Sequence, residues 1–518
     1  MPEFVSAEYA AAQIKDGDTI VTAGSGPGHA APGILHKAIG QLFQETGHPN
    51  KLSLYHASGI AVRGELGIDH FADATMLQRH TTAFLGHTLK LTQMALEDEI
   101  PTYIMPQGVL SQLMRAIAAG LPGYITPIGL HTFVDPRLEG GRYNPSATDE
   151  MISLITVEDQ EYLLYKSFPV QVALLRGTTA DARGNITVAD NTLLGEQLAY
   201  AQAAHNSGGI VIVQVKEHID TIEADPKNVR IPGALVDYIV VCPEQEMGFE
   251  LPHEESLIKQ GPRPTTAESW PLNARKLVAR RAAMELKPGN IYNVGFGMPD
   301  GVPQITLEEG LYDQFTCTIE QGGIGGMPAL GEEFGAMHYA EAFIQQHEQF
   351  DLYHGGGLDI AFLGMAEADA EGNVNVSRFG PMAPGCGGFI DISQSAKRVV
   401  FCGTFIGGSK MEISDGKLVI HKEGKFKKFV QQVQHRTFSG MYALEQGHSI
   451  MYLTERALFE LRPDGVTLVE ISPGIDLQKD ILDLMEFTPI VADDLRTMPD
   501  VLFNDAPVNL AKLIGLEE

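Results

Sequence analysis

The sequence is short of basic residues. It has 37 Lys and Arg residues but 66 Asp and Glu residues, which gives a net charge of -29. Proteins that bind the phosphate backbone need a broad positive surface, so we expect no nucleic-acid partner. No apolar run reaches the roughly 18 residues that a membrane-spanning helix needs, so we expect no membrane partner.

Cysteine is also scarce. The chain has four cysteines, which are too far apart for a CxxC pair or a zinc knuckle. We expect them to be reduced and mostly buried: Cys242, Cys317, Cys386 and Cys402. The 17 histidines form no HExxH or similar pattern, so we predict no metal site and no prosthetic group. The first residues lack the basic and apolar segments of a secretory signal, which predicts a cytoplasmic protein.

Two stretches of the chain repeat each other. The first stretch begins at Lys15 with the letters KDG, continues through an apolar run to GSG at residues 24–26, and then reaches Pro32. A similar series begins at Lys287. Residues between Leu175 and Val188 recur 188 positions later, from Leu363. Short β-branched runs alternate with amphipathic stretches, as in mostly parallel sheets flanked by helices. We therefore predict an α/β protein with two related open α/β domains and an active site between them.

Composition suggests where these domains join. Residues 243–272 are rich in Pro, Glu, Ser and Thr and lack periodicity, which is typical of an exposed linker. We expect an N-terminal domain over residues 1–242 and a C-terminal domain over residues 273–518. The first half is longer between its repeat units, which predicts an insert between about residues 65 and 150.

Glycine is abundant, at 55 of 518 residues, and several loops resemble phosphate-binding turns. The loops that begin at Gly24 and Gly295 lack the third glycine of a dinucleotide fingerprint. The loop from Gly403 to Lys410 has P-loop-like spacing, but its Lys follows the Ser instead of preceding it. This loop stays a candidate for a phosphate-binding turn, whereas tight turns alone would explain most of the other glycines.

An acidic residue stands beside the most glycine-rich turn. Residues 315–319 form a short strand-like run, and Glu320 follows it directly, ahead of the glycines of residues 321–326. Glycines let a bulky substrate approach and leave backbone N–H groups to stabilise developing negative charge. A Glu carboxylate is ordinarily ionised at neutral pH and can attack a thioester without a separate base. On the residues alone, a solvated side chain before a turn explains the pattern at least as well.

The motifs TIEQGGIGG (residues 318–326), GCGGFIDIS (385–393) and PQGVL (106–110) resemble those of family I coenzyme A transferases. The likeness covers nearly the whole chain and is greatest to the fused bacterial acetate/propionate CoA-transferases. It implies ping-pong transfer in which Glu320 attacks acyl-CoA, becomes a glutamyl-CoA thioester, and passes CoA to a second carboxylate. Coenzyme A, acyl-CoA and small carboxylates are then the expected substrates, and a homodimer or homotetramer is the expected assembly.

The same resemblance suggests roles for further residues. The N–H groups of Gly387 and Gly388 should stabilise the thioester oxyanion, and Gln107 and Gly108 should shape the carboxylate pocket. Residues 57–64 lack the adjacent asparagines of related ketoacid transferases, so backbone groups of Gly24, Gly26 or Gly28 are the candidate substitutes, among which the sequence does not decide. Gly26 is included in the expected substrate pocket. The candidates for the CoA side are Asn373, Gly403 and Lys410.

Two other functions fit the same residues. An acyl-CoA hydrolase on this fold would let water reach the same intermediate, and a non-catalytic acyl-CoA-binding protein would form none. No cluster of Lys or Arg adjoins the motifs, which favours short monocarboxylates such as acetate, propionate and butyrate over dicarboxylates.

Overall fold

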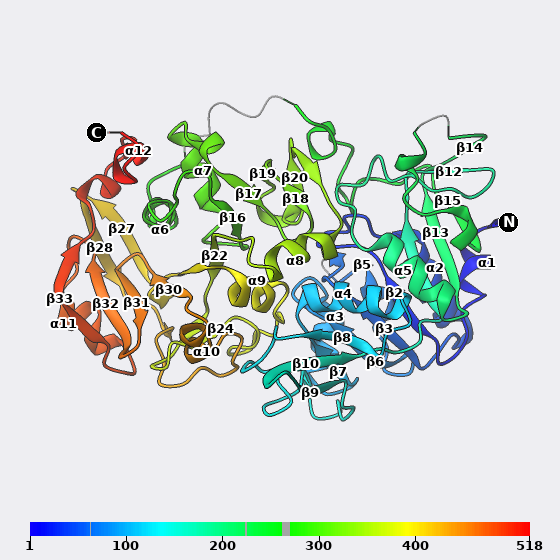
Figure 1. The fold of residues 1–518 in the computed structure, drawn as a ribbon, viewed down its shortest axis with the longest axis horizontal. Coiled ribbons are helices and arrows are strands. Elements are labelled where there is room, and N and C mark those ends of the chain that lie inside the picture. Colours follow the sequence, from blue (N-terminus) through cyan, green and yellow to red (C-terminus); the bar gives the residue numbers. More distant parts are fainter. Residues whose placement is uncertain (63, 223–224, 262–269, 518) are drawn as a thin grey trace.

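The first half of the chain forms a parallel sheet with helices on both faces (Figure 1). The computed structural model describes residues 1–62, 64–222, 225–261 and 270–517. In β2, Ile20 and Val21 point into hydrophobic clusters on opposite faces, as the alternation of side chains along a strand requires. The strands run in the order β1 (Glu3–Phe4), β15 (Tyr238–Val241), β13 (Ile210–Val215), β11 (Val172–Arg176), β2 (Thr19–Thr22), β3 (Leu52–His56), β6 (Leu77–Thr82) and β7 (Thr102–Ile104).

The second half forms a larger, mixed sheet. Its central strands are parallel, whereas β18, β21 and β31 pair antiparallel with their neighbours. The order is β21 (Ala342–Phe343), β18 (Gly323–Ile324), β17 (Thr316–Thr318), β16 (Ile291–Val294), β22 (Ile360–Gly364), β25 (Arg398–Cys402), β30 (Ser449–Leu453), β31 (Ala457–Arg462), β32 (Gly465–Ile471) and β33 (Ile490–Thr497). The predicted α/β class with mostly parallel sheets is confirmed.

The two halves are built on one plan. The strand order β15-β13-β11-β2-β3 in the first sheet matches the order β30-β25-β22-β16-β17 in the second. The repeated sequence forms the same turn in both, because Asp181 accepts hydrogen bonds from the backbone of Asn185 and from its side chain, and Asp369 does so from Asn373. The repeat in the sequence therefore corresponds to a repeat in the structure.

Helices cover the faces of both sheets. In the first half, α4 and α5 contribute to one hydrophobic cluster, and α1, α2 and α3 contribute to the cluster on the other face. The first half contains α1 (Ala7–Ala11), α2 (Gly33–Thr46), α3 (Leu89–Leu96), α4 (Gln107–Ala118) and α5 (Gln197–Asn206). The second contains α6 (Ala274–Ala283), α7 (Gly301–Glu308), α8 (Gln346–His354), α9 (Phe389–Ser395), α10 (Gly440–Glu445), α11 (Leu477–Asp480) and α12 (Leu510–Leu513).

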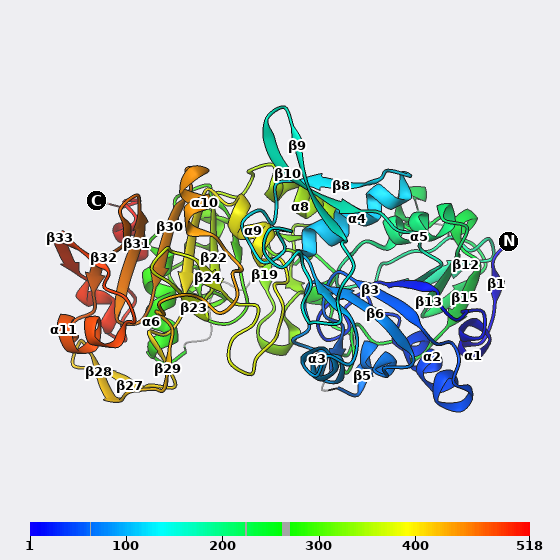
Figure 2. The same ribbon diagram turned by 90° about the horizontal axis from the view of Figure 1, so that it is seen from below.

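Short strands complete the structure. Within the predicted insert and just after it, β8 (Gly123–Thr126), β9 (Ile152–Val157) and β10 (Gln160–Lys166) form an antiparallel sheet beside α4 (Figure 2). The remaining pairs are β4 (Ala61–Val62) with β5 (Leu66–Gly67), β12 (Thr179–Asp181) with β14 (Glu217–Ile219), β19 (Met327–Pro328) with β20 (Met337–His338), β23 (Glu367–Ala368) with β24 (Val374–Asn375), β26 (Ile406–Gly407) with β29 (Phe426–Lys427), and β27 (Lys410–Ser414) with β28 (Lys417–Lys422).

The halves meet through a continuous apolar core. Helix α4 of the first half packs against α8 and α9 of the second, near the middle of the molecule (Figure 1). The cluster under α4 also includes Cys386 and Ile390 from the second half. All four cysteines are free thiols, and three of them are buried, as predicted.

The predicted linker is only partly exposed. Met247, Leu251 and Leu257 are buried and pack with Ala329 and Ala336 of the second half. The prediction of an exposed segment is therefore wrong for these residues, because their apolar side chains gain more by packing than by extending into water. Residues 262–269 of this linker lie outside the described residues. None of the described helices is long and apolar enough to cross a membrane.

Candidate active site

Glu320 stands in a tight turn that follows β17. The backbone N–H of Ile319 donates to the Gly323 carbonyl at 3.0 Å, and the Gly322 N–H donates back to Ile319 at 3.0 Å. Gly322 has a φ of 105°, and a Cβ there would overlap the Ile344 carbonyl, so only glycine fits. This turn leaves the Glu320 side chain half-buried, with Gln107 of the first half among its hydrogen-bonding partners.

The two glycines before α9 differ in what they contact. Gly388 lies directly against the Glu320 carboxylate, where a Cβ would overlap Oε2. A backbone hydrogen bond from Gly388 stabilises the ionised carboxylate. The Gly387 N–H instead donates to the Ala83 carbonyl at 2.9 Å. Of the two predicted oxyanion donors, only Gly388 therefore faces the carboxylate.

A segment of the first half holds this glycine turn in place. Phe84 and Gly385 form an antiparallel bridge, and the Leu85 N–H donates to the Pro384 carbonyl at 2.7 Å. The Cys386 N–H also donates to Ala83, at 2.9 Å. The position of the turn beside Glu320 thus depends on both halves of the chain.

Helix α4 begins at the same place. The Gln107 N–H donates to the Gly387 carbonyl at 3.0 Å, and the Gly108 N–H donates to Oδ2 of Asp391 at 3.1 Å. A Cβ at Gly108 would overlap the buried Phe350 ring, so glycine is needed for α4 to approach α8 this closely. The structure therefore brings Gln107 and Gly108 together with Glu320 and Gly388.

The environment of Glu320 changes its protonation. Burial raises its pKa to about 7, and the nearby Asp391 adds to this shift. Hydrogen bonds from the Gln107 and Gln321 side chains and from Gly388 favour the ionised form but do not offset the burial. Burial therefore opposes the ionisation that an ordinary Glu carboxylate shows at neutral pH.

Gly26, in the first half, lies beside the Phe334 loop of the second half. A Cβ at Gly26 would come 3.0 Å from the Phe334 carbonyl and 3.6 Å from the His29 ring. A Cβ at Gly335 would likewise come 3.6 Å from both His29 and Gln321. Burial lowers the pKa of His29 to about 4, so this imidazole is neutral at physiological pH. Gln321, the neighbour of Glu320, thus connects the carboxylate to the Gly26 loop.

Comparison with known proteins identifies the family of this chain. Residues 4–242 match the model of the coenzyme A transferase family. The chain is 45% identical to a caffeate CoA-transferase of Acetobacterium woodii, over 99% of this chain and all of the relative. It is 42% identical to the acetate CoA-transferase YdiF of Escherichia coli K12, over 97% of this chain and 95% of the relative. The chain belongs to the coenzyme A transferase family.

A solved structure agrees with this assignment over both halves. The YdiF acyl-CoA transferase of E. coli O157:H7, solved as a thioester complex with CoA, superposes with a TM-score of 0.94 at 41% identity. The match covers 98% of this chain and 97% of that one. This CoA transferase therefore has the family's two-part α/β architecture, and CoA thioesters are its substrates.

The three predicted CoA-side residues differ in burial and contacts. Gly403 is buried just after β25, and a Cβ there would come 3.2 Å from Met365 and 3.4 Å from the Lys428 ammonium. Lys410 is exposed on β27. Asn373 is 1% exposed; its amide donates to Asp369 at 3.1 Å and its carbonyl oxygen accepts from the Gly440 N–H at 3.2 Å. Its side chain thus holds a turn inside the second half.

Several residues of this CoA transferase site escaped the sequence reasoning. Phe84 acts through a contact between segments that are distant in the chain, so no local pattern marked it. Asp391 lies in the motif of residues 385–393, but its contact with Gly108 joins distant segments and was not visible in that motif. Lys428 does lie in a lysine-rich stretch, which was a usable signal. Burial lowers its pKa, and its ammonium group donates to the Met365 carbonyl at 3.2 Å.

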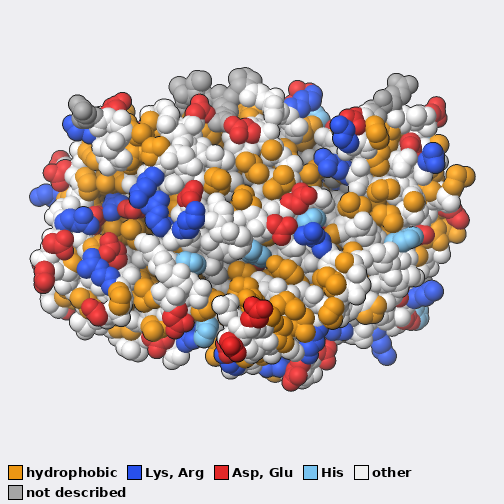
Figure 3. Space-filling model, viewed as in Figure 1, with side chains coloured by type: hydrophobic (Ala, Val, Ile, Leu, Met, Phe, Trp, Pro, Cys, Tyr) orange, Lys and Arg blue, Asp and Glu red, His pale blue; other side chains and the backbone are white. Residues whose placement is uncertain are grey.

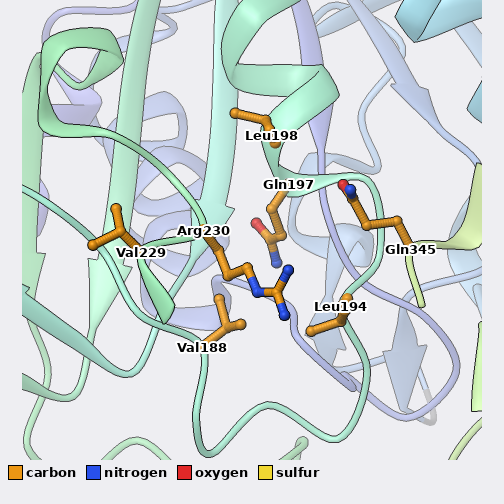
Figure 4. Close-up of a pocket in the computed structure, with 7 residues that line it drawn as sticks. All are labelled: Val188, Leu194, Gln197, Leu198, Val229, Arg230 and Gln345. Atoms are coloured by element: carbon orange, nitrogen blue, oxygen red, sulfur yellow. The ribbon is translucent and has the colours of Figure 1, made fainter. Parts of the chain in front are cut away.

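A cavity of about 90 Å³ lies at the meeting of the halves, beside α5 and α8 (Figure 4). The Arg230 side chain lies among the lining residues in Figure 4, and Glu320 does not line this cavity. The lining comprises Val188, Leu194, Gln197, Leu198, Val229, Arg230 and Gln345. Within the described ranges, no group of three or more His, Cys, Asp or Glu side chains could hold a metal ion.

Proposed function

We propose that Glu320 is the covalent nucleophile of this CoA transferase and that Gly388 supplies the backbone donor to the oxyanion. The position of the Glu320 carboxylate against Gly388 carries the proposal. A donor already in place where negative charge develops stabilises the transition state without reorganisation. The half-buried position of the Glu320 side chain also limits the access of water, which a transferase must exclude to avoid hydrolysis.

The chemistry proceeds through two anhydrides and one thioester. The Glu320 carboxylate attacks the acyl-CoA carbonyl, and the C–S bond breaks to give a mixed anhydride and CoA thiolate. The thiolate attacks the Glu320 carbonyl of this anhydride, which forms glutamyl-CoA and releases the first acid as its carboxylate. The acceptor carboxylate repeats these two steps in reverse, yielding a new acyl-CoA and free Glu320. Only the ionised form of Glu320 is a nucleophile.

Short monocarboxylates are the proposed acyl groups. Among the described groups that shift the pKa of Glu320, none is a Lys or Arg side chain that could bind a second carboxylate. Amides, glycine and the Phe350 ring surround the carboxylate instead. The acetate substrate in the name of YdiF agrees with this class, whereas the caffeate relative makes an aromatic acid the alternative to test.

For the CoA side, we assign Gly403 and Lys410 to the binding of the nucleotide part. Gly403 lies at the carboxyl end of β25, where ligands of parallel sheets usually bind. Figure 3 shows Lys and Arg side chains grouped over the C-terminal part of the molecule, with acidic side chains beside them. Such a group suits phosphate oxygens in a chain whose net charge is -29. For Asn373 we assign an indirect role, through the turn that it holds.

A transfer assay separates the candidate functions. Acetyl-CoA is mixed with propionate, and propionyl-CoA and free CoA are followed by chromatography, with cinnamate in place of propionate as the aromatic arm. We expect propionyl-CoA from the wild-type chain and none from the Glu320→Gln variant. Release of CoA without propionyl-CoA would identify a hydrolase, and no turnover would identify a binding protein. We also infer that the protein is cytoplasmic. We further infer a homodimer or homotetramer, an assembly that light scattering on the purified protein tests.

A further inference from the structure

A second carboxyl group is buried close to the active site. Glu196 precedes α5, and it is 3% exposed. Its Oε1 accepts a short hydrogen bond from the Ser111 hydroxyl of α4 and another from the Gln346 amide of α8. The Gln346 amide also donates to the Ser111 hydroxyl at 2.8 Å. Glu196 thus joins elements of both halves.

Glutamine side chains connect this carboxyl to the nucleophile. The Gln107 Nε2 donates to Oε1 of Gln346 at 3.2 Å. The Gln107 side chain also lies close enough to the Glu320 carboxylate to lower its pKa by donating toward it. The path therefore runs from Glu196 through the Gln346 and Gln107 amides to Glu320, and Gln107 and Gln346 are both 2% exposed.

The ionised form of Glu196 fixes the direction of this path. An ionised carboxylate only accepts hydrogen bonds, so Gln346 must turn its NH₂ group toward Glu196 and its oxygen toward Gln107. Gln107 must then present its own NH₂ group to Gln346, and the second N–H of that group is left for Glu320. If Glu196 is neutral, both amides can reverse, which would place the Gln107 oxygen against the nucleophile.

The surroundings of Glu196 leave it without a permanent countercharge. Tyr55 of β3 and Tyr200 of α5 face it, and their pKa values are raised by burial, so both are neutral. On the two helices that contribute these partners, Arg115 of α4 and Asp351 of α8 pair with each other at 3.2 Å. In the part of the chain that the structure describes, no Lys, Arg or His side chain forms an ion pair with Glu196.

We propose that Glu196 is a positioning residue, which in its ionised form orients the Gln346 and Gln107 amides so that Gln107 donates to Glu320 and to the charge that develops there. This inference rests on the proposed role of Glu320 as nucleophile. Burial raises the pKa of Glu196 to about 7, the same value as that of Glu320. Two protons, one from each carboxyl, must therefore leave before the site is fully active.

The first half-reaction measures this requirement directly. Enzyme in excess is mixed with acetyl-CoA alone between about pH 5 and 9, and the rate of CoA attachment to Glu320 is followed by mass spectrometry. Between about pH 5 and 6, the logarithm of the wild-type rate should rise with pH at a slope of about two, and the slope for Glu196→Gln should be about one. At pH 8 this variant should react about 10²- to 10³-fold more slowly than wild type, the loss expected when one donor to the reacting group is removed.

Two further variants separate orientation from general damage. Gln346→Met breaks the path but keeps Glu196, so it should also give a slope of about one. Ser111→Ala removes a donor to Glu196 but keeps the path, so it should retain the slope of about two with a midpoint at higher pH. The exposed Glu99, replaced by Gln, is the control for removal of a carboxyl and should match wild type.

Each outcome decides one question. A limiting slope of one in wild type, or an unchanged slope in Glu196→Gln, would overturn the positioning role. If Glu196→Gln does not fold, Gln346→Met replaces it as the test. A slope of two in Gln346→Met would also overturn the positioning role. If the wild-type chain turns over but no CoA attaches to Glu320, the nucleophile assignment has failed, which is a separate result.

Discussion

The replacement of Gly388 by Ala tests the geometry of the site with the smallest change that the chain allows. Gly388 has a φ of -84° and a ψ of 5°, which alanine adopts without strain. The added methyl group would overlap Oε2 of Glu320 and lie 3.2 Å from the Phe350 ring. The buried Phe350 ring cannot retreat, so the carboxylate must move away from the Gly388 N–H.

The expected loss follows from what this movement removes. Displacing a reacting group by about 1 Å costs on the order of 100-fold in rate. Loss of one oxyanion donor costs about 10²- to 10³-fold, or about 2.7–4 kcal/mol. We therefore predict that Gly388→Ala lowers kcat at least 100-fold, because the clash is with the reacting group itself. The KM for acetyl-CoA should change much less.

Steady-state transfer from acetyl-CoA to propionate, combined with thermal unfolding, measures this prediction. Gly355→Ala is the matched control, since Gly355 has a φ of -76° and lies at the end of α8 away from Glu320. The control should keep wild-type activity, and both variants should remain folded. A Gly388→Ala variant with kcat within a few-fold of wild type would refute the reasoning, because Glu320 would then not need its observed position.

Three further predictions follow from the site. The kcat/KM for acetyl-CoA should fall at least tenfold per pH unit below about 7 and level off above it; a flat profile from pH 5 to 8 would contradict the raised pKa of Glu320. Because the pKa of Glu320 is about 7 in the folded protein and 4.5 in the reference state, the folded protein loses stability as the pH rises between these two values. Glu320→Gln should therefore abolish transfer, yet at pH 8 its free energy of unfolding should exceed that of wild type by up to about 3 kcal/mol, and its melting temperature should be higher. A lower melting temperature would argue against burial of the charge. Lys410→Ala should raise the KM for acetyl-CoA several-fold at unchanged kcat, and an unchanged KM would remove Lys410 from the CoA site.

Local patterns in the sequence predicted the elements that depend on neighbouring residues. The β-branched run at residues 398–402 forms a strand whose last four residues are buried, since apolar β-branched residues favour the interior of a parallel sheet. The repeated Asp and Asn residues form equivalent turns, because each turn is closed by side chains four residues apart. The placement of Glu320 directly after a strand was likewise visible from its flanking residues.

Contacts between distant segments were beyond the sequence. The pairing of Phe84 with Gly385 joins residues from different halves, and it decides which glycine N–H faces Glu320. The raised pKa of Glu320 depends on burial and on Asp391, a residue 71 positions away. The partial burial of the linker has the same origin, because Met247 and Leu251 find apolar partners that only the folded second half provides.

The identity of the residue that carries CoA is the central claim, and peptide mass spectrometry tests it most directly. The wild-type chain is incubated with acetyl-CoA without an acceptor, then reduced with borohydride or trapped with hydroxylamine, and digested. We predict a modification confined to Glu320, which disappears when propionate is added before trapping. An active enzyme that carries the modification on another residue, or on none, would contradict the account.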